Sequence, residues 1–414
     1  MNYKQRLLDK LLDKFERSRA YLDESTARRR IMIQLSAEFP EYDIEKSETR
    51  SLVNSIVHDL AEQGIVGYDW LPHENGNILS RVWLRLDNLP CAYESAGRTP
   101  KKDKVNTILS MVLDCSQSAA LPWLHEFLST TRAAIEARRR AAPLLPDDVE
   151  QARAVLTALQ GINDRGGEEC LERVFSLQYF GNSKYFENNV RGKVASIIRK
   201  YLVDEDGDLD APSDDEVLSQ VGLVRSPEQI EFSGSMVGQL TGILVDFSAF
   251  KHGATINSPT VADLEIISLP SVKKILFIEN KANYLNYIFR SKSDDELVIF
   301  HGGFYSPARG AFFQKVYETG HRDGVEFRHW SDIDLGGFRI FCRLQSSIIP
   351  ELIPHFMDRE AFISRRQHWV GFGEKYQAEL KKLLELPEYA QFHGVIQLMI
   401  AEKAKLEQEA FLLS

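Results

Sequence analysis

Three short apolar runs separated by helical patterns constrain the fold of this chain most. They span residues 274–278, 297–300 and 325–330. Continuous apolar runs bounded by turn residues are typical of strands buried on both faces. Strands that alternate with helices predict βαβ units and a parallel sheet. This part of the chain is therefore expected to be an α/β domain, with its binding site at the carboxyl ends of the strands.

Each of these runs ends on acids or on paired glycines. Glu279 follows the first run, Gly302 and Gly303 follow the second, and Asp332 and Asp334 follow the third. An extended segment projects residues two positions apart to the same side. Three neighbouring carboxylates repel one another unless a cation compensates, and oxygen ligands without Cys or His favour Mg²⁺ or Mn²⁺. The pattern predicts a metal site; the alternative is an acidic pair that merely caps the next helix.

Residues around these acids would serve a phosphodiester substrate. A divalent cation held by carboxylates can orient a phosphodiester, activate a water and stabilise the leaving oxygen. Glu279 would share a metal or act as general acid–base. Lys281 would contact phosphate or stabilise developing charge, although a surface lysine is an equal alternative. Gly302 and Gly303 would allow close approach of the backbone to DNA, and Arg309 is near enough in sequence to line the site.

Three motifs in this region resemble a Toprim domain, the metal-binding fold of topoisomerases, primases and several nucleases. They are Ile278-Glu279-Asn280-Lys281, Gly302-Gly303, and residues 329–340, which contain Asp332, Asp334 and a Gly-Phe-Arg-Ile tail. The tail most resembles the JetD family. Its members are the nuclease subunits of Wadjet plasmid-defence systems and are related to the DNA-cleaving subunit of topoisomerase VI. Residues 180–187 also resemble a segment upstream of Toprim in that family.

The resemblance implies a metal-dependent endonuclease that cleaves circular double-stranded plasmid DNA. It also implies a homodimer, so that paired sites cut both strands, and recruitment by a condensin-like SMC ATPase complex of the JetABC type. The chain has no Gly-x-x-x-x-Gly-Lys-Ser/Thr stretch, so any ATP use would fall to partners. Two alternatives stay open: a strand breaker like topoisomerase VI with a tyrosine nucleophile, and a non-catalytic winged-helix DNA-binding or scaffold protein.

A chain of 414 residues is too long for one ordinary core, and three parts are expected. Residues 1–95 would hold an amphipathic arm helix, which packs on its own domain or on a partner, and a winged-helix-like module with a hairpin at Asn75-Gly76. Residues 96–225 would form a helical or winged-helix-like domain that faces DNA and carries an acidic loop at 204–216. Residues 226–414 would form the Toprim catalytic domain with C-terminal helices, the last over residues 396–413.

Basic residues suggest where DNA would lie. The best candidate surface is residues 182–202, where Lys184, Arg191 and Lys193 are interleaved with aromatics. In the N-terminal module the candidate phosphate contacts are Arg28, Arg29, Arg30, Arg81 and Arg85. The net charge of −10 argues against a protein coated in nucleic acid, but local basic patches still supply phosphate contacts.

The sequence also predicts a cytoplasmic protein without a membrane anchor. Its apolar runs fall short of the roughly 18–20 residues that a spanning helix needs. The N-terminus is charged from Lys4 onwards, unlike a secretory signal. Four scattered cysteines suit a reducing compartment and free thiols.

Overall fold

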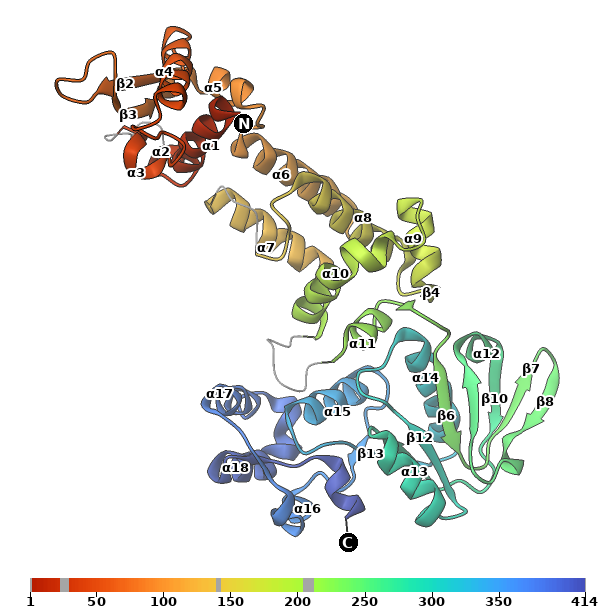
Figure 1. Ribbon diagram of the computed structural model, residues 1–414. Helices are drawn as coiled ribbons and strands as arrows, with labels where there is room; N and C mark the ends of the chain where they lie inside the picture. Colours follow the sequence, from red (N-terminus) through yellow and green to blue (C-terminus); the bar gives the residue numbers. More distant parts are fainter. Residues whose placement is uncertain (1, 23–29, 139–142, 204–211, 414) are drawn as a thin grey trace. The chain divides into compact units, whose positions relative to one another are not determined.

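The computed structural model of the chain describes residues 2–22, 30–138, 143–203 and 212–413. Its elements are labelled in Figure 1. The chain divides into two compact units: Met1–Ser118 with Leu128–Arg153, and Ala119–Phe127 with Ala154–Ser414. Mixed helices and sheets, some strands of which are parallel, confirm a multidomain α/β protein. The finer division at residues 95 and 225 stays a prediction.

The arm helix of the first unit, α1 (Tyr3–Glu16), is part of that unit's own core. Its five apolar residues lie on one face and are all buried, in one cluster with residues of α4 (Ser47–Glu62). A three-stranded antiparallel sheet of order β1-β3-β2 joins this cluster, and Gly76 has a positive φ of 81° between β2 and β3. Its strands are β1 (Met32–Gln34), β2 (Val66–Trp70) and β3 (Leu79–Leu84).

The rest of the N-terminal half is helical. Arg81 and Arg85 are exposed, whereas Arg28 and Arg29 lie outside the described residues. Pro143 and Pro146 lie between α7 and α8. The helices are α2 (Arg19–Leu22), α3 (Leu35–Glu38), η2 (Leu86–Asn88), α5 (Leu89–Ala96), α6 (Lys101–Ser118), α7 (Pro122–Arg138) and α8 (Val149–Arg165).

The second unit is built on a six-stranded sheet of order β14-β13-β11-β12-β6-β9. The three predicted strands form its centre, and β11 pairs in parallel with both β12 and β13. On one side β14 continues the parallel part; on the other, β6 pairs antiparallel with β12, and β9 pairs antiparallel with β6. The strands are β6 (Gln229–Ser233), β9 (Ala254–Asn257), β11 (Lys274–Ile278), β12 (Glu296–Phe300), β13 (Glu326–Trp330) and β14 (Ile353–Pro354).

The two crossover helices cover opposite faces of this sheet. On α13 (Lys281–Arg290), Tyr284 packs against Phe300, which is paired with Ile278. On α14 (Pro307–Arg322), Phe313 packs against Phe277, whose side chain points to the other face because strand residues alternate. The chain passes from β11 to β12 on one side and then to β13 on the other. The strand order therefore reverses at β11, the place where open α/β sheets form a crevice.

The end of the chain differs from the predicted closing helix over residues 396–413. Helix α18 (His393–Glu402) ends at Lys403, which has a left-handed φ of 52°. The chain continues extended as β16 (Ala404–Lys405) and then as the short helix η8 (Gln408–Leu412). The prediction was wrong because Leu406 pairs with Ile333 beside the sheet, a contact that local periodicity does not encode.

The second unit also contains a second, smaller sheet and further helices. A small antiparallel sheet of order β10-β7-β8 lies beyond β6 and β9 (Figure 1). The elements are β4 (Cys170–Leu171), α9 (Glu172–Phe180), η3 (Phe186–Val190), α10 (Arg191–Ile198), η4 (Arg199–Val203), α11 (Asp214–Ser219), β5 (Leu223–Val224), β7 (Val237–Leu240), β8 (Ile243–Asp246), η5 (Phe247–Ala249), α12 (Ser258–Asp263), β10 (Leu264–Ser268), α15 (Leu335–Ser347), α16 (Arg359–Ser364), η6 (Arg366–His368), β15 (Val370–Gly371), α17 (Glu374–Leu383) and η7 (Pro387–Phe392).

Candidate metal centre

The carboxyl ends of β11 and β13 bring Glu279 next to the segment that carries Asp332 and Asp334. Ile278 and Trp330 are paired across the two strands, and the Glu279 N–H donates to the Trp330 carbonyl at 3.0 Å. The apolar residues of β11, buried on both faces, and the buried Phe327, His329 and Trp330 of β13 fix this register. The structure thus places the three predicted acids at one edge.

These carboxylates are close enough to oppose one another's ionisation. Burial, and then the negative charge of Asp334, raise the pKa of Glu279 to about 8. Burial and the charge of Glu279 raise the pKa of Asp332 well above its usual range. Within the described chain, Oε2 of Glu279 is buried and has no hydrogen-bond partner. A cation at this edge would relieve both the repulsion and the unpaired oxygen.

Asp334 has a structural task as well. It is only 6% exposed, and its Oδ1 accepts the Gly337 N–H at 2.7 Å as the N-cap of α15. Its Oδ2 lies 3.8 Å from the Lys405 ammonium. The helix-capping alternative therefore applies to Asp334, although its charge still acts on Glu279 and Asp332.

Two further acids reach the same edge from the end of the chain. Leu406 and Ile333 exchange backbone hydrogen bonds of 2.9 and 3.2 Å, and the Gln408 N–H donates to Asp332 Oδ1 at 2.6 Å. These bonds hold Glu407 and Glu409 beside Asp332. One carboxylate oxygen from each of these three acids lies within 4.8 Å of the other two.

The arrangement fits a hard divalent cation. The donor atoms are carboxylate oxygens, and the raised pKa values of Glu279 and Asp332, with the unpaired Glu279 Oε2, indicate that negative charge is crowded here. The Lys405 ammonium, which lies 3.1 Å from Glu407 and 3.8 Å from Asp334, balances part of this negative charge. Oxygen donors of this kind suit Mg²⁺ or Mn²⁺ better than zinc. The residues that would hold such an ion are Glu279, Asp332, Glu407 and Glu409, with Asp334 behind them.

A polar cavity of about 380 Å³ opens beside these acids. Six predicted site residues line it together: Glu279, Lys281, Gly302, Gly303, Arg309 and Asp332. Glu216, Ser219 and Glu228 complete the wall, and sequence reasoning did not identify them. The cavity is therefore where a substrate would meet the carboxylates.

The basic residues of this cavity are held by neighbours. Lys281 forms an ion pair with Glu231, and its ammonium lies 4.6 Å from the centre of the Phe300 ring. Arg309 donates to the carbonyls of His301 at 2.8 Å and Gly302 at 3.3 Å. Gly302 and Gly303 have φ values of 68° and 71°, which favour glycine. Arg309 thus shapes the glycine loop, and Lys281 would have to leave Glu231 to reach a phosphate.

Comparisons with known proteins match the part of the chain that holds these carboxylates. The family model described as "Wadjet protein JetD, C-terminal" matches residues 240–413. Over 415 aligned positions the chain is 28% identical to the "Wadjet protein JetD" of Bacillus cereus (strain Q1), covering 99% of this chain and 98% of that protein.

Along nearly its whole length the chain is similar to a JetD protein, and residues 240–413 match the JetD C-terminal model.

The JetD family match contains all five acids of the centre. Glu279, Asp332, Asp334, Glu407 and Glu409 all fall within residues 240–413. Glu216 and Glu228, which line the cavity, lie before that match. The JetD C-terminal region therefore supplies the carboxylates, and the segment before it supplies part of the wall.

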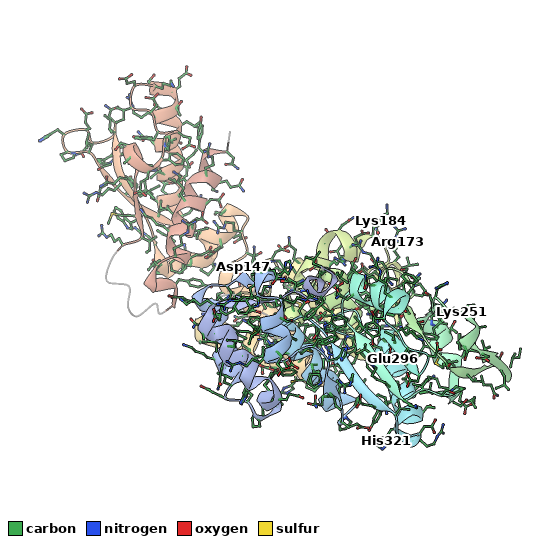
Figure 2. All side chains as sticks on the ribbon, turned by 90° about the horizontal axis from the view of Figure 1, so that it is seen from below. Asp147, Arg173, Lys184, Lys251, Glu296 and His321 are labelled. Carbon is green, nitrogen blue, oxygen red and sulfur yellow. The ribbon has the colours of Figure 1, made fainter. Side chains whose placement is uncertain are left out.

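The three basic residues of the candidate DNA surface at 182–202 have different environments. Lys184 and Lys193 are exposed, and Lys184 projects outward in Figure 2. Arg191 is buried, with its guanidinium 3.2 Å from Glu172 and 3.3 Å from Asp214 and paired also with Asp215. A phosphate would have to displace these carboxylates to reach Arg191, and contact of all three residues with DNA stays a prediction.

Glu407 and Glu409 could not be identified from the sequence. They lie more than 70 residues after Asp332 and have no strand-end or motif signal of their own. Glu407 and Glu409 flank Gln408, and they reach the site only because Leu406 pairs with Ile333.

For the described residues, none of the helices is both long and apolar enough to cross a bilayer.

Proposed function

We propose that the chain is a metal-dependent DNA endonuclease of an anti-plasmid defence complex. The observation that carries the proposal is the convergence of oxygens from Asp332, Glu407 and Glu409 beside Glu279. Carboxylates at the carboxyl edge of a parallel sheet suit phosphodiester hydrolysis assisted by Mg²⁺ or Mn²⁺. The Bacillus cereus relative is named as a Wadjet protein, and we extend that defence role to this chain.

The proposal gives each side chain a task. A bound cation would supply Lewis acidity and lower the pKa of a coordinated water. Asp332, with Glu407 and Glu409, would hold that ion, Asp334 would support it from behind, and Glu279 would share it or move a proton at the scissile phosphate. Lys281, released from Glu231, and the loop of Gly302, Gly303 and Arg309 contact the DNA backbone.

We also propose an assignment for the folds of the two domains and for the partners of the chain. We assign the sheet around β11 to a Toprim domain and the β1-β3-β2 sheet with its helices to a winged-helix module. Lys184 and Lys193 would contact double-stranded plasmid DNA. A homodimer would place two centres on the two strands, and a condensin-like SMC ATPase complex of the JetABC type would deliver the DNA in the cytoplasm.

A cleavage assay tests this proposal. The purified chain is incubated with supercoiled and linear plasmid plus Mg²⁺ or Mn²⁺, and again with the condensin-like complex and ATP. We expect cutting that EDTA abolishes and that Asp332→Asn slows by about 100-fold or more, because the neutral amide removes one charge from the centre. Asp323→Asn, an exposed residue that follows α14, is the matched control and should cut like the wild type.

Two outcomes would contradict the proposal. One is cleavage by Asp332→Asn at the wild-type rate. The other is a covalent protein–DNA adduct on a denaturing gel, which would indicate a tyrosine nucleophile such as Tyr179, Tyr185 or Tyr201. Free DNA ends are the result expected of hydrolysis.

A further inference from the structure

A second cavity, of about 620 Å³, has aromatic walls and is lined in part by residues close in sequence to the acids of the metal centre. Trp330, Phe356 and Phe411 line it. Trp330 ends β13 two residues before Asp332, and Phe411 follows Glu409 by two residues. The cavity and the carboxylates are therefore built from the same two segments of chain.

The three rings form one cluster with an open face. The centroid of Trp330 is 5.5 Å from that of Phe356 and 5.6 Å from that of Phe411, both edge to face. Phe356 and Phe411 are nearly parallel, at 17°. Phe356 is 47% exposed, although its ring also lies 4.2 Å from that of His355, and a flat ligand could stack on the exposed part of this cluster.

Phe356 is held in a conformation that its side chain disfavours. Its φ is +53°, which is uncommon for a bulky residue and is strained. The preceding His355 is tied to β13, because its N–H donates to the His329 carbonyl at 2.8 Å. Strain of this kind persists where the surrounding structure imposes it, often at ligand sites. Here it presents the Phe356 ring at the cavity.

Polar groups in the cavity wall lack partners. In the described part of the chain, neither the indole N–H of Trp330 nor Oδ1 of Asn283 makes a hydrogen bond, although both residues are buried, at 5% and 1% exposure. Nε2 of His355 is also unpaired there. A ligand that satisfies them needs both an acceptor and a donor as well as a flat ring. A simple cation offers no acceptor to the indole, whereas a nucleobase offers all three.

We propose that this cavity holds a nucleobase from an unpaired stretch of the DNA strand that runs to the metal centre. Aromatic stacking would hold the ring, and Trp330 and Asn283 would bond its polar edge. The identity of the polymer rests on the proposed function. The stacking site itself is a separate property that can be measured without cleavage.

Binding in EDTA tests the proposal, because no divalent cation is then present and no strand is cut. Fluorescence anisotropy is measured with a dye-labelled single strand and with the matching blunt duplex. We expect Phe356→Ala to weaken single-strand binding by at least about 5-fold and to leave duplex binding unchanged. Phe411→Leu is the second variant, and Phe250→Ala is the control, since Phe250 is 53% exposed and lies outside the cavity. Thermal unfolding confirms that each variant is folded.

Three results would overturn the inference. In the first, the wild type and Phe356→Ala bind the single strand with equal affinity. In the second, Phe250→Ala loses as much single-strand affinity as Phe356→Ala. In the third, free dAMP displaces the strand at a concentration equal to that of the oligonucleotide. The last would assign the cavity to free nucleotides. A chain that binds single strands through Phe356 but fails to cut DNA would contradict the proposed nuclease and leave the base site intact.

Discussion

At the scale of single residues, Asp332 is the acid on which the others converge. It is half-buried, its Oδ1 accepts the Gln408 N–H at 2.6 Å, and its pKa is raised by burial and by Glu279. A carboxylate in these surroundings is unfavourable unless positive charge is added. This imbalance is the physical reason to expect that the edge binds a cation.

Glu407 and Glu409 are expected to contribute to that binding. Because one oxygen of each lies within 4.8 Å of an Asp332 oxygen, Glu409→Gln and Glu407→Gln should each weaken Mn²⁺ binding by about 10-fold. Calorimetric titration with Mn²⁺ measures the change. Glu385→Gln removes an exposed acid elsewhere and is the control. Unchanged affinity in both test variants would leave the C-terminal acids without a role in the centre.

Two buried histidines make stability depend on pH. Burial lowers the pKa of His329 to about 3. Burial also lowers the pKa of His301 well below its usual range, and the neighbouring His329, Arg309 and Arg343 lower it further. The unfolded chain, with histidine pKa values of about 6.5, binds protons first as the pH falls. The stabilisation is therefore complete above that pH and is lost progressively from about pH 6.5 towards pH 3.

Denaturant unfolding at pH 7.5 and pH 5.5 measures this effect. Each histidine should reduce the free energy of unfolding by about 1.4 kcal/mol over that interval. His329→Leu should make the pH dependence smaller by that amount. A wild type and variant with identical pH dependence would show that His329 accepts a proton in the folded protein.

At the scale of elements, the strap formed by residues 404–409, from β16 into η8, crosses the strand ends. Gln408 is 1% exposed, accepts the Asn280 N–H at 2.9 Å and donates to the Trp330 carbonyl at 3.2 Å. Its own carbonyl accepts from Asn283 at 2.8 Å. One side chain therefore joins β11, β13 and the C-terminal acids.

Gln408→Ala is expected to lower the free energy of unfolding by about 2–4 kcal/mol, because the Asn280 N–H and the Trp330 carbonyl lose their partner inside the protein. The same variant should weaken Mn²⁺ binding, since the strap also positions Glu407 and Glu409. Gln391→Ala, at an exposed position, is the control for both measurements. A variant as stable as the wild type would mean that the strap is held by its backbone bonds alone.

The elements that could be predicted from the sequence are those with a local signal. The runs at 274–278, 297–300 and 325–330 correspond to β11, β12 and β13, because the buried positions of these strands require mainly apolar side chains. The strap could not be predicted, since it depends on the pairing of Leu406 with Ile333. The ion pairs of Arg191 could not be predicted for the same reason, because its partners Glu172 and Asp214 come from other elements.

At the scale of the whole molecule, cutting both strands of a duplex calls for two centres. One chain has a mass of 47.2 kDa and one such cluster among its described acids. A two-fold dimer is the commonest way to pair identical sites. Light scattering on the purified chain should therefore give twice that mass. A single-chain mass at micromolar concentration, with or without DNA, would contradict the dimer.

The central claim is that the acids at the carboxyl edge of β11 and β13 hold one divalent cation or more. Anomalous X-ray diffraction from crystals containing Mn²⁺ tests it most directly. The account predicts a Mn²⁺ peak within about 2.0–2.5 Å of oxygens from Asp332 and at least one of Glu279, Glu407 and Glu409. Crystals in which that edge has no peak, at a Mn²⁺ concentration that supports DNA cleavage, would contradict it.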